Sequence, residues 1–326
     1  MRSDDQALAD GIRRAERRAL AKAITLLEST RRDDRARADA LLNALLPSTG
    51  RSSRLGISGV PGVGKSTFIE AIGLHLIERG HRVAVLAVDP SSSLSGGSIL
   101  GDKTRMERLS AHPSSYIRPS PSGGTLGGVA ERTREAMLVC EAAGFDVVIV
   151  ETVGVGQSET MVAGMTDLFV LLQLPNAGDD LQAIKRGVME VADVIIVNKM
   201  DLDVGAAARA GAALLSAVRT FSLHGRGGGR PPVLQLSALQ GDGIAECWMT
   251  IERCLGERRE SGEFDRRRRD QALTWMWDHI RARLNEDFRA HPRVQAALPA
   301  VLADVSAGRI APSAAARALL ALFEQC

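Results

Sequence analysis

The sequence contains little of what metal centres and secreted proteins are built from. It has four cysteines and six histidines in 326 residues, and no two cysteines form a Cys-x-x-Cys pair. Zinc and nickel sites are usually made from clusters of these side chains, so the composition argues against such a site. Few, scattered cysteines also indicate a reducing compartment in which thiols stay free.

Long apolar runs and a strong net charge are missing as well. The best apolar stretch, 161–174, is interrupted by Asp167, so no run reaches the length that a membrane helix needs. The first eighteen residues alternate in charge and lack the apolar centre of a signal peptide. The net charge of +2 gives no global attraction to nucleic acid or to anionic membranes. We therefore predict a cytoplasmic protein without a nucleic-acid or membrane partner.

The middle of the chain alternates short apolar runs with helical patterns. The runs are expected strands, and they are Leu55–Ser58, Val83–Val88, Asp146–Val150, Leu168–Leu174, Val194–Val197 and Val233–Leu236. Short apolar strands separated by helices predict an α/β fold with a mostly parallel central sheet that helices cover on both faces. In such sheets ligands bind beyond the carboxyl ends of the strands.

Helical patterns lie on either side of this middle part. Residues 6–46 repeat apolar side chains at helical spacing, and the chain is again helical from about 264, with a last helix over 313–323. The expected parts are a helical N-terminal extension over 1–50, a central α/β domain over 51–260 and a helical C-terminal arm over 261–326. Four consecutive arginines, 266–269, favour a solvated helix face or linker, and the alternative is a docking patch for an acidic partner.

One segment of the central domain predicts a phosphate-binding loop. It reads Gly59-Val60-Pro61-Gly62-Val63-Gly64-Lys65-Ser66-Thr67 and matches G-x-x-x-x-G-K-[ST] between an expected strand and an expected helix. The glycines let backbone N–H groups turn inward around an anion, and the helix N-terminus points at the same place. Lys65 adds a full charge toward the β- and γ-phosphates, and the Ser66 hydroxyl can ligate Mg²⁺. The central domain is therefore expected to be a P-loop NTPase.

A second segment, Asn198-Lys199-Met200-Asp201, follows an expected strand and matches the guanine-reading pattern N-K-x-D. The Asp201 carboxylate can accept hydrogen bonds from N1–H and the N2 amino group of guanine. Adenine offers neither donor, and unpaired buried acceptors make such discrimination strong. Asn198 would brace the loop, and the stem of Lys199 would lie over the base. A weaker pattern after the last expected strand, Ser237-Ala238-Leu239, resembles the loop that contacts guanine O6.

Three carboxylates are candidates for the magnesium and hydrolysis region: Asp89, Asp102 and Glu151. Glu151 ends an expected strand, and Gly154 after it could approach a γ-phosphate. Each carboxylate can bind Mg²⁺ directly, bind it through water or position the attacking water, and the sequence leaves these roles open. Asp89 could instead form a turn, and Asp102 could be a solvated loop carboxylate.

Further segments extend the comparison to the whole chain. They are Asp89-Pro-Ser-Ser-Ser, 97–106, 116–121, 124–128 and Glu151–Glu159. Together with the two motifs they resemble the MeaB/ArgK family, which belongs to the metallochaperone-like branch of the SIMIBI class of P-loop GTPases. Members of this family are chaperones of adenosylcobalamin-dependent methylmalonyl-CoA mutase.

The resemblance implies a homodimer joined by the C-terminal helices and a low intrinsic GTP hydrolysis that the mutase stimulates. GTP would gate cofactor loading and protect the mutase. By position, Asp89 lies in switch I, Asp102 lies near the metal and Glu151 begins switch II. Residues 176–187 match a third switch, where Gln182 and Lys185 are candidates for signalling or stimulated catalysis. Arg105 is a candidate arginine finger.

Two other functions would be compatible with a P-loop in this chain. A GTPase that inserts nickel into a hydrogenase or urease would share the fold, but His-rich or Cys-containing metal motifs near the P-loop are missing from the sequence. A kinase or ATPase tied to amino-acid transport would need to bind adenine, against which Asp201 argues.

Overall fold

The computed structural model divides the chain into two compact units, Met1–Gln271 and Ala272–Cys326. The residues that the structure describes are 3–29, 31–88, 106–119, 126–152, 158–175, 186–221 and 230–324. In these parts of the chain no helix is both long and apolar enough to cross a bilayer.

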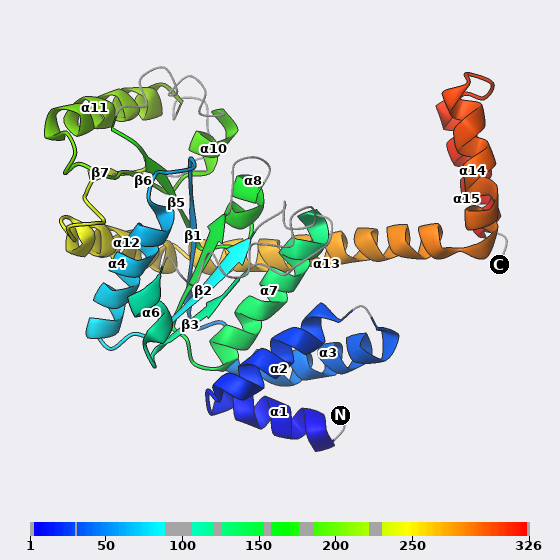
Figure 1. Cartoon of the computed structure of the whole chain (residues 1–326), viewed down its shortest axis with the longest axis horizontal. Helices are drawn as coiled ribbons and strands as arrows, with labels where there is room; N and C mark the ends of the chain where they lie inside the picture. Colours follow the sequence, from blue (N-terminus) through cyan, green and yellow to red (C-terminus); the bar gives the residue numbers. More distant parts are fainter. Residues whose placement is uncertain are drawn as a thin grey trace. The chain divides into compact units, whose positions relative to one another are not determined.

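The first unit is built on a parallel sheet with the strand order β3-β2-β4-β1-β5-β6-β7 (Figure 1). Its strands are β1 (Ser53–Gly59), β2 (Val83–Val88), β3 (Ser115–Arg118), β4 (Val147–Thr152), β5 (Leu168–Gln173), β6 (Val194–Val197) and β7 (Val233–Gln235). Every described pair of neighbouring strands is parallel. The α/β prediction is confirmed, and the edge strand β3 is an addition to it.

Helices cover both faces of this sheet. They are α4 (Lys65–Glu78), α6 (Glu107–Ala111), α7 (Leu126–Ala142), α8 (Ser158–Ala163), α10 (Arg186–Val191), α11 (Val204–Phe221) and α12 (Ile244–Glu260). Because successive side chains of a strand point to opposite faces, Leu55 and Ile57 of β1 pack toward α4 and α12, whereas Gly56 faces α8. A Cβ atom on Gly56 would lie 2.8 Å from side-chain atoms of Val162 and Thr166, so α8 sits directly on the central strand.

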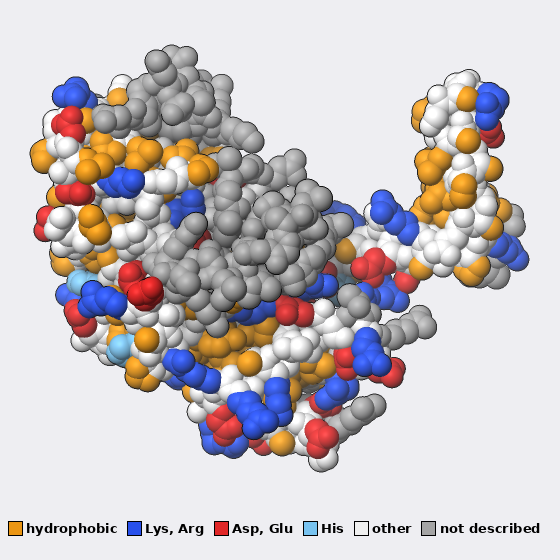
Figure 2. All heavy atoms as spheres, in the orientation of Figure 1, with side chains coloured by type: hydrophobic (Ala, Val, Ile, Leu, Met, Phe, Trp, Pro, Cys, Tyr) orange, Lys and Arg blue, Asp and Glu red, His pale blue; other side chains and the backbone are white. Residues whose placement is uncertain are grey.

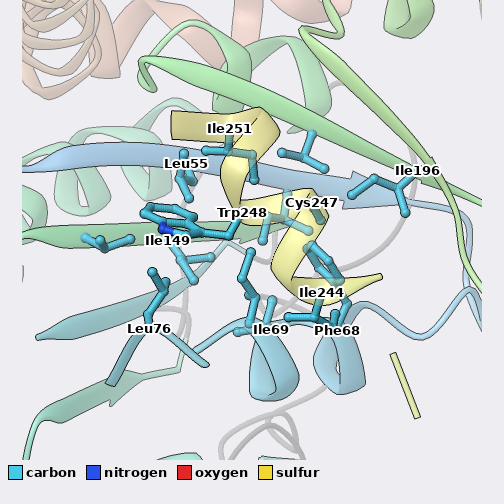
Figure 3. Close-up of a cluster of buried hydrophobic side chains, with 14 of the residues drawn as sticks. Leu55, Phe68, Ile69, Leu76, Ile149, Ile196, Ile244, Cys247, Trp248 and Ile251 are labelled. Carbon is cyan, nitrogen blue, oxygen red and sulfur yellow. The ribbon is translucent and has the colours of Figure 1, made fainter. Parts of the chain in front are cut away.

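The main apolar core lies between the sheet and the pair α4 and α12. Figure 3 shows Phe68 and Ile69 of α4 beside Cys247, Trp248 and Ile251 of α12, all among strand side chains. These side chains are at most 4% exposed. Burial of this kind fixes α4, and with it the loop from which α4 begins.

The N-terminal segment forms α1 (Ser3–Arg13), α2 (Arg17–Glu28) and α3 (Arg32–Leu45), followed by a 3₁₀ turn over Leu46–Ser48. The helices α2 and α3 pack on α7. Glu135 of α7 is held in this region, where burial, with the nearby charges of Glu131 and Asp39, raises its pKa to about 8.

A network of charged side chains lies at the amino-terminal ends of the strands. Arg54 of β1 lies 2.7 Å from Glu141 of α7, and both side chains are buried. Burial alone would raise the pKa of Glu141, but the hydrogen bond and charge of Arg54 outweigh it and hold that pKa below its ordinary value. Asp167, which only interrupts an apolar run in the sequence, pairs with Arg268 at 2.7 Å.

The arginine run is therefore only partly a solvated face. It lies near the start of α13 (Glu263–Ala290), where Arg266 and Arg269 are exposed while Arg267 and Arg268 are partly buried against the segment that joins α8 to β5. The side chain of Arg268 is 13% exposed, and its guanidinium group bonds to the Asp167 carboxylate instead of to water. The prediction of a solvated face is wrong for this pair because the helix buries one of its sides.

The second unit contains the rest of α13 together with α14 (Pro292–Ser306) and α15 (Pro312–Glu324). Phe323 of α15 contacts Phe288 and His291 edge to face, with ring centroids 5.6 and 5.5 Å away. Leu319 of α15 and Val294 of α14 are buried in the same unit. The two last helices thus share a small apolar contact.

Candidate nucleotide-binding site

The predicted phosphate-binding loop connects β1 to α4. Gly62 and Gly64 have φ angles of +78° and +94°, in the left-handed region that L-residues with a side chain rarely adopt. The turn is closed by a hydrogen bond from Val63 N to Val60 O at 3.2 Å. Glycine at these positions therefore lets the chain reverse just before Lys65 begins the helix.

Lys65 lies folded over this loop. Its Nζ donates to Gly59 O at 2.8 Å and to Val60 O at 3.4 Å. The ammonium group is thus held at the mouth of the loop, beside the N-terminus of α4. A cation and a helix N-terminus at one place create a site suited to phosphate groups.

The predicted base-reading loop is joined to the phosphate loop by one buried side chain. Asn198 is 1% exposed; its Nδ2 donates to Val63 O at 2.8 Å, and its Oδ1 accepts from Ala238 N at 3.0 Å. A Cβ atom on Gly64 would come within 2.8 Å of the same Nδ2. The loops after β1, β6 and β7 therefore meet at Asn198.

The rest of the base-reading loop is open to solvent. Lys199 has a φ of +63°, and Met200 N donates to Leu236 O at 3.2 Å, which holds the turn against β7. Beyond this anchor Asp201 is exposed, as is Leu239 after the buried Ser237 and Ala238. An exposed carboxylate beside an anchored loop is free to accept hydrogen bonds from a bound base.

The oxygen atoms expected to hold magnesium converge from α4 and β4. Ser66 Oγ lies 3.5 Å from Glu151 Oε1, and Glu151 is 4% exposed. Mg²⁺ prefers oxygen ligands and keeps several waters, and a hydroxyl next to a buried carboxylate fits this preference. Among the described residues, no group of three or more His, Cys, Asp or Glu side chains is arranged to hold a metal ion.

Several predicted site residues lie outside the described part of the chain. They are Asp89, Asp102, Gly154, Gln182 and Lys185, together with Arg105. Of the sequence-predicted carboxylates for magnesium, Glu151 is the one that the described residues place beside Ser66.

Two contacts near the site carry no sequence motif. Thr152 Oγ1 donates to Ser58 Oγ at 2.7 Å, which joins the ends of β4 and β1 inside the protein. Glu70 of α4 accepts hydrogen bonds from the backbone N–H groups of Arg108 and Leu109 at 2.8 and 3.3 Å, and so caps α6. Both contacts join residues far apart in sequence, and a local pattern therefore gives no signal for them.

The strand, glycine loop and helix with Lys65 and Ser66, together with the parallel sheet, define a P-loop nucleotide-binding protein. Residues 20–293 match the family model described as methylmalonyl Co-A mutase-associated GTPase MeaB. The chain belongs to this family, and it is a GTPase.

Relatives of known name agree with this assignment. The chain is 54% identical to "Probable GTPase Rv1496" of Mycobacterium tuberculosis, covering 96% of this chain and 93% of the relative. It is 47% identical to GTPase ArgK of Escherichia coli, over 89% of this chain and 90% of the relative. It is also 45% identical to the mitochondrial methylmalonic aciduria type A homolog of Mus musculus, over 96% of this chain and 78% of the relative.

A solved structure extends the likeness to three dimensions. The crystal structure of a LAO/AO transport system kinase aligns with a TM-score of 0.79 and 36% identity, and the alignment covers 100% of this chain and 99% of that chain.

Proposed function

We propose that this GTPase binds GTP with Mg²⁺ in order to regulate adenosylcobalamin loading of methylmalonyl-CoA mutase and to protect that enzyme. The observation that carries the nucleotide part of the proposal is the bond pattern of Asn198, which ties the phosphate loop to the base loop. One molecule that carries both a polyphosphate and a purine would engage both loops at once.

Each group of residues has a chemical task in this proposal. The backbone N–H groups of the glycine loop and Lys65 hold the phosphates, and the Asp201 carboxylate accepts hydrogen bonds from guanine. Ser66 and Glu151 would hold Mg²⁺ directly or through water; the ion neutralises charge that develops on the phosphates. Low intrinsic hydrolysis that rises on contact with the partner fits a switch.

The mutase enters the proposal through the family. The family description names a mutase-associated GTPase, and the mouse relative is named for methylmalonic aciduria. A protein that changes shape between GTP and GDP can release or retain a partner, which is how it would gate cofactor delivery.

We include a homodimer built from the C-terminal unit. Figure 2 shows apolar side chains on the outside of α14 and α15. The exposed large apolar residues of this unit are Leu273, Met276, Trp277, Ile280, Leu284, Leu302 and Leu320. Their spacing on α13 places several along one helical face, the kind of surface that associates with another helix.

GTP turnover, measured alone and with purified mutase, tests the proposal. We expect slow turnover that rises with the mutase, and loss of turnover in Lys65→Ala because the phosphates lose their counter-charge. Lys22→Ala, at an exposed lysine of α2, is the matched control and should behave as the parent. Full turnover in Lys65→Ala would refute the phosphate site, and no response to the mutase would refute the partner.

Nucleotide choice separates this proposal from a transport-linked kinase, the description carried by the similar solved structure. We expect a fluorescent GTP analogue to bind far more tightly than the matching ATP analogue, because adenine cannot donate to Asp201. Equal affinity would favour the kinase.

A further inference from the structure

The first turns of α13 bond to the end of α8. Arg267 donates from Nε to Thr166 O at 3.0 Å and from Nη2 to Ala163 O at 3.0 Å. Gln271 Nε2 donates to the same Thr166 O at 2.9 Å. Since residues four apart lie on one side of a helix, Arg267 and Gln271 form a single contact, which we call the α8–α13 joint.

The joint supplies bonds that α8 cannot make by itself. The last carbonyl groups of any helix have no partner inside the helix. In α8 the carbonyls of Thr160 and Val162 accept from the turn that follows, from Gly164 N at 2.9 Å and Met165 N at 3.1 Å. The side chains of α13 serve the carbonyl of Ala163 and that of Thr166, which lies beyond α8.

At its other end α8 is connected to the candidate magnesium site. Five residues separate its first residue, Ser158, from the end of β4, where Glu151 lies beside Ser66. Val162 of α8 packs against Gly56 of β1 so closely that a methyl group on Gly56 would not fit. Because this contact is so close, a shift of β1 at Gly56 displaces α8 as well.

The next residue of α13 bonds to a different part of the protein. Arg268 pairs with both carboxylate oxygens of Asp167, at 2.8 and 2.7 Å, and donates to Gly50 O and Ser52 O at 2.8 and 2.7 Å. Asp167 Oδ2 also accepts from Arg54 N at 2.7 Å, so Arg268 is bound to the sheet itself. The bond from Arg267 to Ala163 O reaches α8 itself, whereas the bonds of Arg268 reach residues at the starts of β1 and β5. The start of α13 is thus bonded both to α8 and to the sheet.

We propose that the α8–α13 joint transmits the nucleotide state of the P-loop site to α13. The proposal rests on the proposed function, because it requires that GTP and GDP place α8 differently. The helix α13 spans Glu263–Ala290, and its residues from Ala272 onward belong to the second unit. The joint is therefore the point at which the GTPase unit acts on the segment that carries the exposed apolar residues.

Hydrogen exchange of the full-length protein, read by mass spectrometry, tests the joint. The samples contain Mg²⁺ with GDP or with a non-hydrolysable GTP analogue. In the parent protein we expect residues 53–67 to be protected by both nucleotides, and residues 272–290 to exchange at rates that differ about threefold or more between the two. In the double variant Arg267→Ala/Gln271→Ala, residues 272–290 should exchange at the same rate with either nucleotide, while residues 53–67 remain protected.

The chain offers a close control on the same helix. Arg266→Ala removes an exposed arginine one residue away and should keep the parent behaviour. Gln271→Met preserves the shape of the side chain without its donor, and it should weaken the difference in a protein that folds even where the double variant does not. If Gln271→Met and Arg267→Ala both keep the full difference in exchange of residues 272–290 between the two nucleotides, the proposal is wrong.

The outcomes separate the two proposals. If 53–67 are protected but 272–290 exchange alike with both nucleotides in the parent, the joint does not transmit the state and the inference is wrong. If neither nucleotide protects 53–67, the nucleotide site itself is wrong, and the inference falls with it.

Discussion

Replacing Asn198 by alanine should separate the base-reading loop from the phosphate loop. The side chain is 1% exposed and bonds Val63 O at 2.8 Å and Ala238 N at 3.0 Å. The variant leaves both backbone groups buried without these partners. Each such group costs about 1–3 kcal/mol, so the two together cost about 2–6 kcal/mol.

This cost divides between folding and nucleotide binding. If loops that separate in the free protein must be rejoined when nucleotide binds, the cost appears in the dissociation constant. The lower figure, about 2 kcal/mol, corresponds to a roughly 30-fold rise in Kd. Because Asn198 lies at the base-reading loop, GDP and GTP should be weakened by the same factor.

Titration with fluorescent GDP and GTP analogues, together with urea unfolding, measures both parts. The control is Asp203→Ala, which removes a hydrogen bond to Ala206 N of 2.8 Å at the start of α11. It should lose about 1 kcal/mol of stability, as for a helix cap, with Kd unchanged. An Asn198→Ala protein that keeps its Kd within about threefold and its unfolding midpoint would refute the reasoning.

Three other changes test separate parts of the structure. Gly64→Ala should weaken both nucleotides at least about tenfold in the same titrations, because its φ of +94° disfavours a side chain and the new Cβ would lie 2.8 Å from Asn198 Nδ2; an unchanged Kd would contradict this. Asp201→Asn should shift preference from GTP toward xanthosine triphosphate, whose C2 oxygen accepts the amide donor, and retained guanine preference in competition binding would count against the base assignment. Burial raises the pKa of Glu135 to about 8 in the folded protein, so folding favours the protonated carboxyl. The contribution of Glu135 to the free energy of unfolding is therefore complete below about pH 4.5 and is lost as pH rises through 8. Melting temperatures at pH 6 and 9 should therefore fall more in the parent than in Glu135→Gln, and equal falls would show that Glu135 does not titrate in this way.

The sheet could be predicted from the sequence because its central strands are buried on both faces. Their apolar runs are continuous, and β2 and β6 have the bounds Val83–Val88 and Val194–Val197 that the runs predict. The edge strand Ser115–Arg118 mixes polar and apolar residues, and β2 is its one neighbour among the described strands, so its sequence carries no comparable signal. The sequence pattern does not separate the helix Pro292–Ser306 from its neighbours either.

The candidate site divides in the same way. The phosphate and base loops are short contiguous motifs whose backbone geometry depends on residues such as Gly64, and local sequence predicts them. The bond from Asn198 to Val63 spans 135 residues, and Arg268 reaches Asp167 across 101. Such pairs depend on the tertiary arrangement, and the arginine run could be separated into exposed and buried members only once α13 was placed against the sheet.

The strand order has a consequence for how nucleotide preference can change. From Glu151 at the end of β4 to Asn198 after β6 there are three steps across the sheet, through β1 and β5. Hydrogen bonding fixes each step at about 4.8 Å, so the span is roughly 14 Å whatever side chains fill the core. The sheet thus keeps the distance between the ends of β4 and β6 constant. Relatives with the same strand order can acquire a new base or phosphate preference through their loops, whereas mutations in the core can alter stability without altering that length.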